Sequence, residues 1–165
     1  MMNKENDKID PVCKMHVDTE SLHVEYLGSH FYFCSEQCSE RFIANPHLYI
    51  GKAGVPSPKQ QGMHVIKQRV IRLDAPITKI IQKNLIETLL NMMGIKQVDT
   101  EGDVIRIRYD LLEVTAEQIE KAIGQSGAEL DSIWKERLKR AFVHYIEETE
   151  LENLEHQDES HGCHN

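Results

Sequence analysis

The chain has 165 residues, of which 40% are hydrophobic, and a formal net charge of −8. This length and composition suit one ordinary domain or two small ones, and we predict two small modules of the α+β class. The sequence has no run of 18 apolar residues, which excludes a helix that spans a membrane, and its first ten residues lack the apolar core of a secretory signal. We therefore expect a cytoplasmic protein without membrane insertion.

The cysteines and the distribution of charge limit the classes of function that this chain can have. Four cysteines in a chain without an export signal are expected to stay reduced, which leaves metal binding or redox chemistry. Seven acidic residues fall within 147–159, a segment without Lys or Arg. Because such a segment disfavours binding to phosphate backbones, we predict no nucleic-acid partner.

The first predicted module covers residues 10–50. It begins with a loop that carries Cys13 and continues with two strands, 23–26 and 31–33, around a Leu-Gly-Ser-His turn. Alternation on both sides of a turn that contains glycine is typical of a β-hairpin. A short helix follows and is expected to stop before an Asn-Pro pair, because the residue before a proline disfavours the helical conformation.

Cys13, Cys34 and Cys38 are the candidate metal ligands. Ser35 can cap the short helix, so Cys34 precedes the helix and Cys38 lies in its first turn. Backbone N–H groups and the dipole at a helix N-terminus favour the thiolate form. Thiolates bind Zn(II), Cu(I) and similar thiophilic ions, so we predict zinc or copper(I) as the cofactor.

A closed tetrahedral site needs a fourth ligand. His16 stands in Cys-x2-His spacing from Cys13 and would complete a Cys3His set. Met15 is the rival donor, and its thioether would shift selectivity toward Cu(I) or Ag(I).

The second predicted module covers residues 64–133, after a Gly-, Pro- and Gln-rich connection at 51–63 that is expected to be flexible. Its elements read strand, helix, strand, strand, helix, strand, and the last strand, 128–133, is expected at an edge. Thr78 and Thr115 can cap the two helices. This order fits a ferredoxin-like βαββαβ sandwich.

A C-terminal amphipathic helix is predicted over 134–155, followed by a flexible tail at 156–165. Its apolar face must cover either its own sheet or a second subunit. The residues of this face are Trp134, Leu138, Ala141, Phe142, Tyr145 and Ile146. In the tail, His161, Cys163 and His164 offer two imidazoles and a thiol as an accessory metal site, and an uninvolved tail is the alternative.

The types and spacing of several residues in the first module form a recognisable pattern. These residues are Asp10-Pro11-Val12-Cys13, Met15, Tyr26, Gly28, Tyr32-Phe33-Cys34-Ser35, Cys38, Phe42, Asn45-Pro46 and Tyr49. This pattern resembles the YHS family, a TRASH-like, treble-clef metal knuckle. The resemblance implies that Cys13, Cys34 and Cys38 are ligands and that the protein acts in heavy-metal sensing, trafficking or resistance. Such modules occur in metal-responsive proteins and at the cytoplasmic ends of copper-transporting P-type ATPases. Lys14 departs from the glycine usual there.

The second module resembles the heavy-metal-associated domain of copper chaperones in its element order. That family places a Met-x-Cys-x-x-Cys loop between the first strand and the first helix. Here residues 73–78 read Leu-Asp-Ala-Pro-Ile-Thr, so the metal-transfer dithiol is missing. We interpret the module as a degenerate relative that serves docking or dimerisation.

The leading hypothesis is a metal-binding protein of heavy-metal homeostasis that is not an enzyme and binds one thiophilic ion. Its expected partners are the ion, a metal transporter or a second copy of the chain. The alternative is an interaction module in which a permanent zinc only holds the knuckle together. RNA binding is disfavoured because Tyr109 is the single plausible stacking aromatic on the predicted sheet. The sequence carries no phosphate loop and no Cys-x-x-Cys redox pair.

Overall fold

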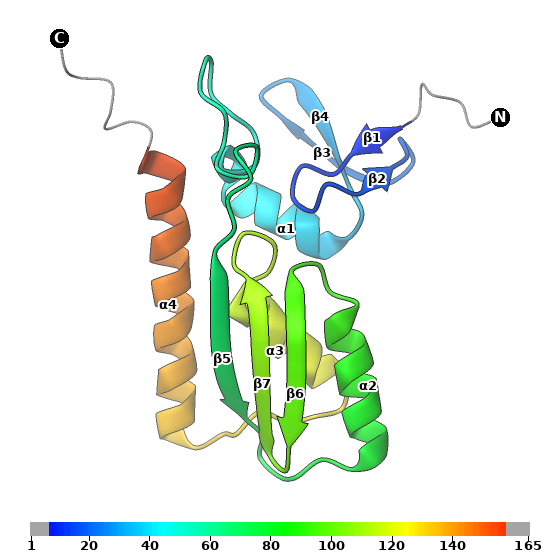
Figure 1. Cartoon of the computed structure of the whole chain (residues 1–165), viewed down its shortest axis with the longest axis vertical. Helices are drawn as coiled ribbons and strands as arrows, with labels where there is room; N and C mark the ends of the chain where they lie inside the picture. The colour runs from blue at the N-terminus through cyan, green and yellow to red at the C-terminus, as the bar shows by residue number, and fades with distance from the viewer. Residues whose placement is uncertain (1–6, 158–165) are drawn as a thin grey trace. The chain divides into compact units, whose positions relative to one another are not determined.

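The computed structural model describes residues 7–157, which form a mixed α+β structure. These residues divide into two compact units (Figure 1). The first unit contains residues 7–63 and 151–157, and the second contains residues 64–150. The division after Met63 falls where the sequence predicts the start of the second module.

The first unit contains two small antiparallel sheets. β1 (Lys8–Ile9) pairs with β2 (His16–Val17), so the loop that carries Cys13 is closed at its base. β3 (Leu22–Tyr26) pairs with β4 (Ser29–Phe33) along their whole length. The predicted hairpin is therefore present.

The turn of this hairpin is tighter than the sequence predicts. Ser29 and His30, expected in the turn, are the first two residues of β4, and only Leu27 and Gly28 connect the strands. Both have positive φ, 50° and 75°, which is the two-residue turn whose twist matches the flanking strands.

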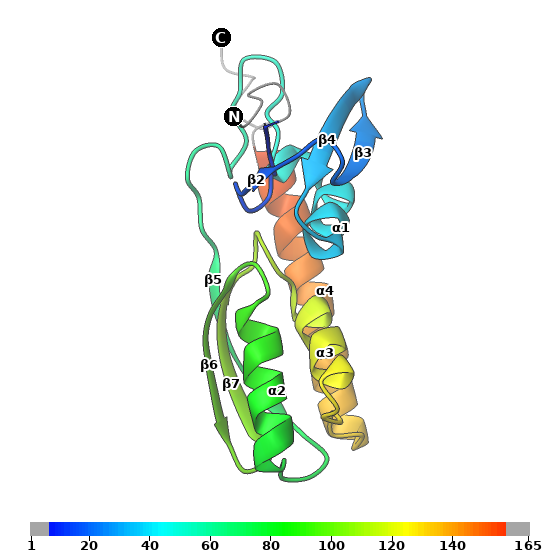
Figure 2. The same cartoon turned by 90° about the vertical axis from the view of Figure 1, so that its right-hand side faces the viewer.

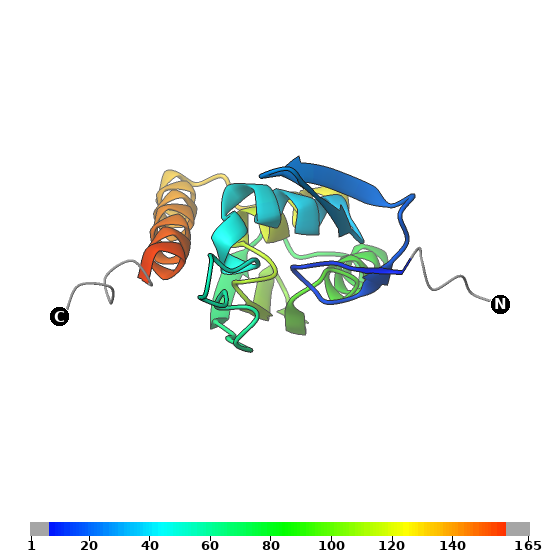
Figure 3. The ribbon, with the colours of Figure 1, turned by 90° about the horizontal axis from the view of Figure 1, so that it is seen from above.

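α1 (Glu36–Ala44) begins and ends where the sequence predicts. Ser35 is its N-cap, and the Ser35 hydroxyl accepts a hydrogen bond from the backbone N–H of Cys38 (3.4 Å). The helix stops before Asn45, and the short 3-10 helix η1 (Pro46–Leu48) follows. Figure 3 shows α1 running beside the β3–β4 hairpin.

Aromatic rings form the core of the first unit. The fully buried Phe42 of α1 contacts four rings, with centroid separations between 4.8 and 6.4 Å. These rings belong to Tyr26, Phe31, Phe33 and Tyr49. Aromatic pairs at such distances stabilise a core beyond the area that they bury. The core fixes α1 against the hairpin and so positions the segment that holds Cys34 and Cys38.

Residues 51–63, predicted to be a flexible connection, form turns that belong to the first unit. Ser57 and Lys59 are only 2% and 7% exposed. The Lys59 N–H donates to the carbonyl of Leu48 (3.0 Å), and the Ser57 N–H donates to the side chain of Gln60 (2.8 Å). Here the prolines and glycines mark tight turns, which the same composition also favours.

A three-stranded antiparallel sheet is the base of the second unit. β5 (Ile66–Arg72) and β6 (Ile95–Glu101) both pair with β7 (Val104–Asp110), which gives the order β5-β7-β6. α2 (Lys79–Leu90) and α3 (Ala116–Gln125) cover one face of the sheet (Figure 2). Strand order and helix placement up to α3 are those of the predicted βαββα series.

The core of this unit is aliphatic apart from Tyr109. It contains Ile71, Leu73, Leu85, Leu89, Ile105, Ile107, Leu111, Leu112, Val114, Ile119 and Ile123. The predicted helix caps are confirmed: the Thr78 hydroxyl accepts from the Ile81 N–H (3.3 Å), and Thr115 forms a capping box with Gln118.

The fourth strand expected at 128–133 is reduced to one β-bridge between Leu130 and Leu73. Two hydrogen bonds flank the bridge, from Asp74 N–H to Glu129 and from Asp131 N–H to Arg72. The chain then turns away, because the Asp131 carboxylate accepts from the N–H of Ile133 (2.9 Å) just before the last helix begins. The complete four-stranded ferredoxin-like sheet is therefore not formed.

α4 (Trp134–His156) lies close to the predicted bounds, but its apolar face does not cover the sheet. Trp134, Leu138, Phe142 and Tyr145 are between 61% and 67% exposed. The opposite side of the helix packs on the second unit, where Glu147 is 4% exposed. No helix in the described residues is long and apolar enough to cross a membrane.

Candidate metal centre

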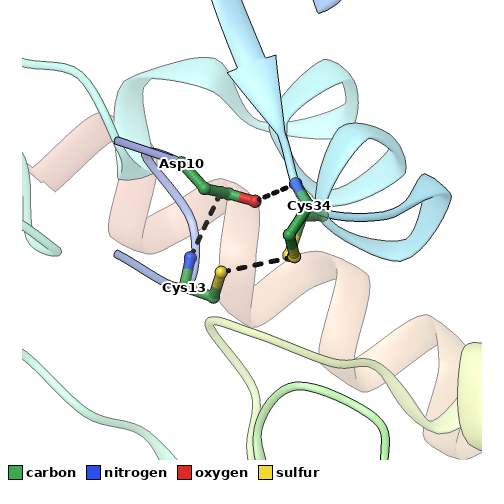
Figure 4. Close-up of side chains that lie close together, drawn as sticks. Asp10, Cys13 and Cys34 are labelled. Carbon is green, nitrogen blue, oxygen red and sulfur yellow. Dashed lines mark hydrogen bonds between the residues drawn. The ribbon is translucent and has the colours of Figure 1, made fainter. Parts of the chain in front are cut away.

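Three sulfur atoms and one carboxylate meet in the first unit. The Sγ atom of Cys34 lies 3.5 Å from that of Cys13 (Figure 4). It lies 3.6 Å from that of Cys38. The ligand atoms of these cysteines and of Asp10 all lie within 4.8 Å of one another. The structure thus brings together the three cysteines that the sequence predicts to share a site, and it adds Asp10.

Cys13 is held by a tight turn between β1 and β2. The turn is closed by two backbone hydrogen bonds, from Lys14 N–H to the Asp10 carbonyl and from Asp10 N–H to the Met15 carbonyl, both 2.9 Å. Lys14 has a φ of 66°, in the left-handed region that favours glycine. This conformation gives a physical reason for glycine at this position of the YHS pattern.

Cys34 and Cys38 come from the junction of β4 and α1. Cys34 follows the last residue of β4, and Cys38 lies in the first turn of α1, where it is fully buried. Cys13 and Cys34 are half-buried. The helix N-terminus favours negative charge on Cys34 and Cys38, but burial of Cys34, and for Cys38 the hydrogen bond to Cys13 together with burial, outweighs this effect and raises the pKa of both thiols.

Asp10 ties the two thiol-bearing segments together. Its side chain is fully buried and accepts hydrogen bonds from three backbone N–H groups. One oxygen accepts from Val12 (2.8 Å) and Cys13 (3.3 Å), and the other accepts from Cys34 (2.8 Å), as Figure 4 shows for the two cysteines. A carboxylate satisfied in this way positions the sulfurs and adds a negative charge beside them.

Sequence reasoning missed this role of Asp10. The signal is present, because an Asp side chain commonly accepts from the N–H two residues onward and so forms a turn. The bond to the Cys34 N–H joins residues 24 positions apart, and no local pattern predicts it.

The three thiols differ in acidity. Hydrogen bonding from Cys38 lowers the pKa of Cys13 below its ordinary value of 9.0, although burial opposes this shift. Burial raises the pKa of Cys34 to about 11, and the hydrogen bond to Cys13 together with burial raises the pKa of Cys38. Without a cation Cys13 is therefore the most acidic of the three thiols.

The donor set fits a thiophilic cation. Sulfurs bound to one tetrahedral zinc at about 2.3 Å lie about 3.8 Å from one another. The two separations found here, 3.5 and 3.6 Å, come within a few tenths of an ångström of that value. The cluster is therefore compatible with metal binding after small side-chain adjustments, with Cys13, Cys34 and Cys38 as the donors and Asp10 beside them.

The other predicted donors lie apart from this cluster. The His16 ring donates to the carboxylate of Asp7 (2.9 Å), and its side chain is 69% exposed. Met15 is 46% exposed. The cluster of potential ligand atoms contains Asp10 as its fourth member and does not contain His16. His161, Cys163 and His164 lie outside the described residues.

The segment that contains the cluster matches the model of a known family. Residues 8–53 match the family model of the YHS domain. The match contains all four residues of the cluster and ends before the second unit. No curated protein and no solved structure matched the chain.

The second unit contains no cysteine, because the chain's thiols lie at positions 13, 34, 38 and 163. The segment between β5 and α2, residues 73–78, is anchored by backbone bonds from Leu73 N–H to Asp103 and from Asp74 N–H to Glu129. The position that holds a dithiol loop in heavy-metal-associated domains is thus an ordinary connection. No family match supports that relationship, which stays a prediction from the element order.

Proposed function

We propose that the protein binds one thiophilic ion, zinc or Cu(I), through Cys13, Cys34 and Cys38 and acts in cytoplasmic metal homeostasis or resistance without being an enzyme. One observation carries the proposal: three sulfurs from two separate segments converge, with neighbouring separations of 3.5 and 3.6 Å. The convergence depends on a buried carboxylate that holds both segments. The match of residues 8–53 to the YHS domain supports the same reading.

The identity of the fourth ligand should decide whether the site prefers zinc or Cu(I). Carboxylate oxygen is an ordinary zinc ligand, whereas soft sulfur donors select Cu(I). Asp10 therefore favours zinc as a fourth donor, and the three sulfurs without it favour Cu(I). His16 becomes a donor only if it leaves Asp7, and Met15 only if its exposed side chain turns inward.

X-ray absorption spectra of the zinc-loaded protein test the fourth donor. The variants Asp10→Asn, His16→Ala and Met15→Leu are compared at equal metal loading. We expect three sulfur scatterers in every sample and a change in the light-atom shell only in Asp10→Asn. A change confined to His16→Ala would restore the Cys3His set that the sequence predicts.

The alternative is an interaction module in which zinc is purely structural. The small core of the first unit favours this reading, because small domains commonly need a metal to fold. Under the alternative, the second unit would dock a partner such as a metal transporter.

Exchange kinetics distinguish transport or sensing from a structural role. The protein is loaded with Cu(I) or zinc under anaerobic, reducing conditions and mixed with a chromophoric chelator. A functional ion is expected to transfer within minutes, faster than the metal-loaded first unit opens as measured by hydrogen exchange. Transfer that is no faster than this opening would support the structural-zinc alternative. Failure of both metals to bind in a one-to-one ratio would contradict both readings.

A further inference from the structure

α4 has an inverted amphipathic arrangement over residues 134–150. A helix on the surface of a domain normally turns its apolar stripe toward the core. Here the stripe faces solvent, and we define the α4 stripe as Trp134, Leu138, Ala141, Phe142 and Tyr145. Its four large side chains are between 61% and 67% exposed, and Ala141 is exposed too.

Polar contacts hold the other side of α4 on the second unit. Glu147 accepts hydrogen bonds from the Tyr109 hydroxyl and from the Ala116 N–H at the start of α3 (2.7 Å). His144 bonds to Glu120 of α3 at 2.9 Å. Turning the stripe inward would break these bonds and leave Glu147 without its partners, at a cost typical of a buried charge. The stripe is therefore fixed in its outward orientation.

The kind and adjacency of these exposed side chains indicate that another molecule covers them. Single exposed apolar side chains are ordinary, but an adjacent series that includes Trp, Phe and Tyr marks an interaction site. The residues follow one another at intervals of four, three and one positions, so they lie on one side of the helix. Ala141, in the middle, permits close approach of another helix.

The charges on the two sides of the stripe indicate that the molecule that covers it is a second copy of α4. The N-terminal half of α4 carries the exposed Lys135, Arg137 and Lys139, and the C-terminal half carries the exposed Glu148 and Glu152. Arg137 and Glu148 are eleven positions apart, about three helical turns, so both lie on the same flank. An antiparallel copy of the same helix would set Arg137 of each chain against Glu148 of the other, whereas a parallel copy would oppose like charges.

We propose that α4 is the interface of a homodimer in which the stripes of two chains pack antiparallel across a two-fold axis. Such an interface is self-complementary, as two-fold symmetry requires. Aromatic side chains at its centre supply most of the affinity, and the Arg137–Glu148 pairs at its rim set the orientation. The α4 stripe, Arg137 and Glu148 all lie in the second unit, so we expect a dimer that does not depend on the metal centre.

Sedimentation analysis of the full chain under reducing conditions tests the interface. We expect the wild type to dimerise and Phe142→Glu to weaken dimerisation at least about tenfold, because a central aromatic anchor is replaced by a charge. The control is Ile80→Glu on α2, whose side chain is 74% exposed and lies outside the stripe. Circular dichroism of each variant confirms that it is folded.

Charge reversal tests the antiparallel orientation without touching the apolar stripe. Arg137→Glu and Glu148→Arg each create two repulsive pairs in their own homodimer, so each is expected to associate more weakly than the wild type at low salt. An equimolar mixture of the two variants restores both attractive pairs and is expected to form heterodimers. A wild type that stays monomeric at all concentrations, or that as a monomer binds lipid vesicles through the stripe, would overturn the proposal. So would a Phe142→Glu variant that dimerises like the wild type, or a mixture that associates no better than its components.

Discussion

The two units of this protein are both small α+β structures, but the side chains that form their cores differ. The first has an aromatic core around Phe42 and places three thiols and a buried carboxylate beside it. The second has an extended aliphatic core and no cysteine. In the described residues the candidate metal ligands are therefore a few side chains of the first unit, whereas the second unit, whose element order led us to predict a metal-transfer domain, contributes no thiol.

Removal of the metal is expected to produce the largest difference in stability between the two units. In small zinc domains the apparent free energy of binding is about 10 kcal/mol or more and is largely folding free energy. Chelation should therefore lower hydrogen-exchange protection in α1 and β4 and leave protection in β7 and α3 unchanged. Hydrogen exchange with mass spectrometry resolves these segments in the full chain.

The matched control for this experiment lies in the other unit. Leu89→Ala empties a fully buried site of the aliphatic core and should cost about 3 kcal/mol there, while metal uptake is unchanged. Equal loss of protection in both units on chelation, or in neither, would break the comparison.

The affinity for metal should depend steeply on pH. Burial raises the pKa of Cys34 to about 11, and the pKa of Cys38 is also raised, so both sulfurs carry protons at pH 7 in the free protein. A bound cation requires thiolates, so binding releases at least these two protons and should strengthen at least about 100-fold for each unit of rising pH between 7 and 8.5. Competition titrations at several pH values measure this slope.

The sign of the pH effect is opposite for the stability of the metal-free first unit. A thiol pKa raised in the folded state contributes stability below the ordinary value of 9.0, and this stability is lost as the pH rises through about 11. Alkali should therefore destabilise the free unit while it strengthens metal binding. A pH-independent affinity would show that the thiols do not exchange protons for the ion.

Replacement of Asp10 should have the next largest effect. Asp10→Ala leaves three backbone N–H groups without their acceptor in a buried site, which should cost the first unit about 3 kcal/mol and weaken metal binding. Asp10→Asn keeps an acceptor oxygen and should lose less stability. The exposed Glu25→Ala in β3 is the matched control, and urea titrations followed by hydrogen exchange measure the differences. If Asp10→Ala and Glu25→Ala lost equal stability, the buried Asp10 carboxylate would not stabilise the first unit as proposed.

Lys14→Gly should change the stability of the first unit least, and it should raise this stability where the Asp10 variants lower it. Lys14 adopts a φ of 66°, which costs a residue with a side chain about 1 kcal/mol relative to glycine. The variant should stabilise the first unit by up to about that amount and leave the second unchanged. A destabilised variant would show that the Lys14 side chain contributes more to the turn than its backbone strain costs.

Much of the local structure could be predicted because its signals are local. Ser35, Thr78 and Thr115 cap their helices as their positions indicate, and the hairpin and the spacing of the cysteines lead to the thiol cluster. These features depend on neighbours within a few residues or on alternation along a strand, which the sequence displays directly.

The features that could not be predicted depend on distant contacts. Asp10 reaches the Cys34 N–H across 24 positions, and His16 is bound by Asp7 although its spacing from Cys13 suits a ligand. The apolar face of α4 indicates a buried surface, but its orientation is set by the bonds of Glu147 and His144 on the other side. Periodicity identifies such a face without saying which neighbour covers it.

The central claim is that Cys13, Cys34 and Cys38 together bind one thiophilic ion. The most direct test is the metal content of protein isolated anaerobically and reloaded with zinc or Cu(I), compared between the wild type and the triple Cys-to-Ser variant, with Cys163 kept in both. The account predicts one ion per chain in the wild type and less than about a tenth of that in the variant, because hydroxyl groups are poor ligands for thiophilic ions. Equal metal content in the two proteins, or no stoichiometric uptake by the wild type, would contradict it.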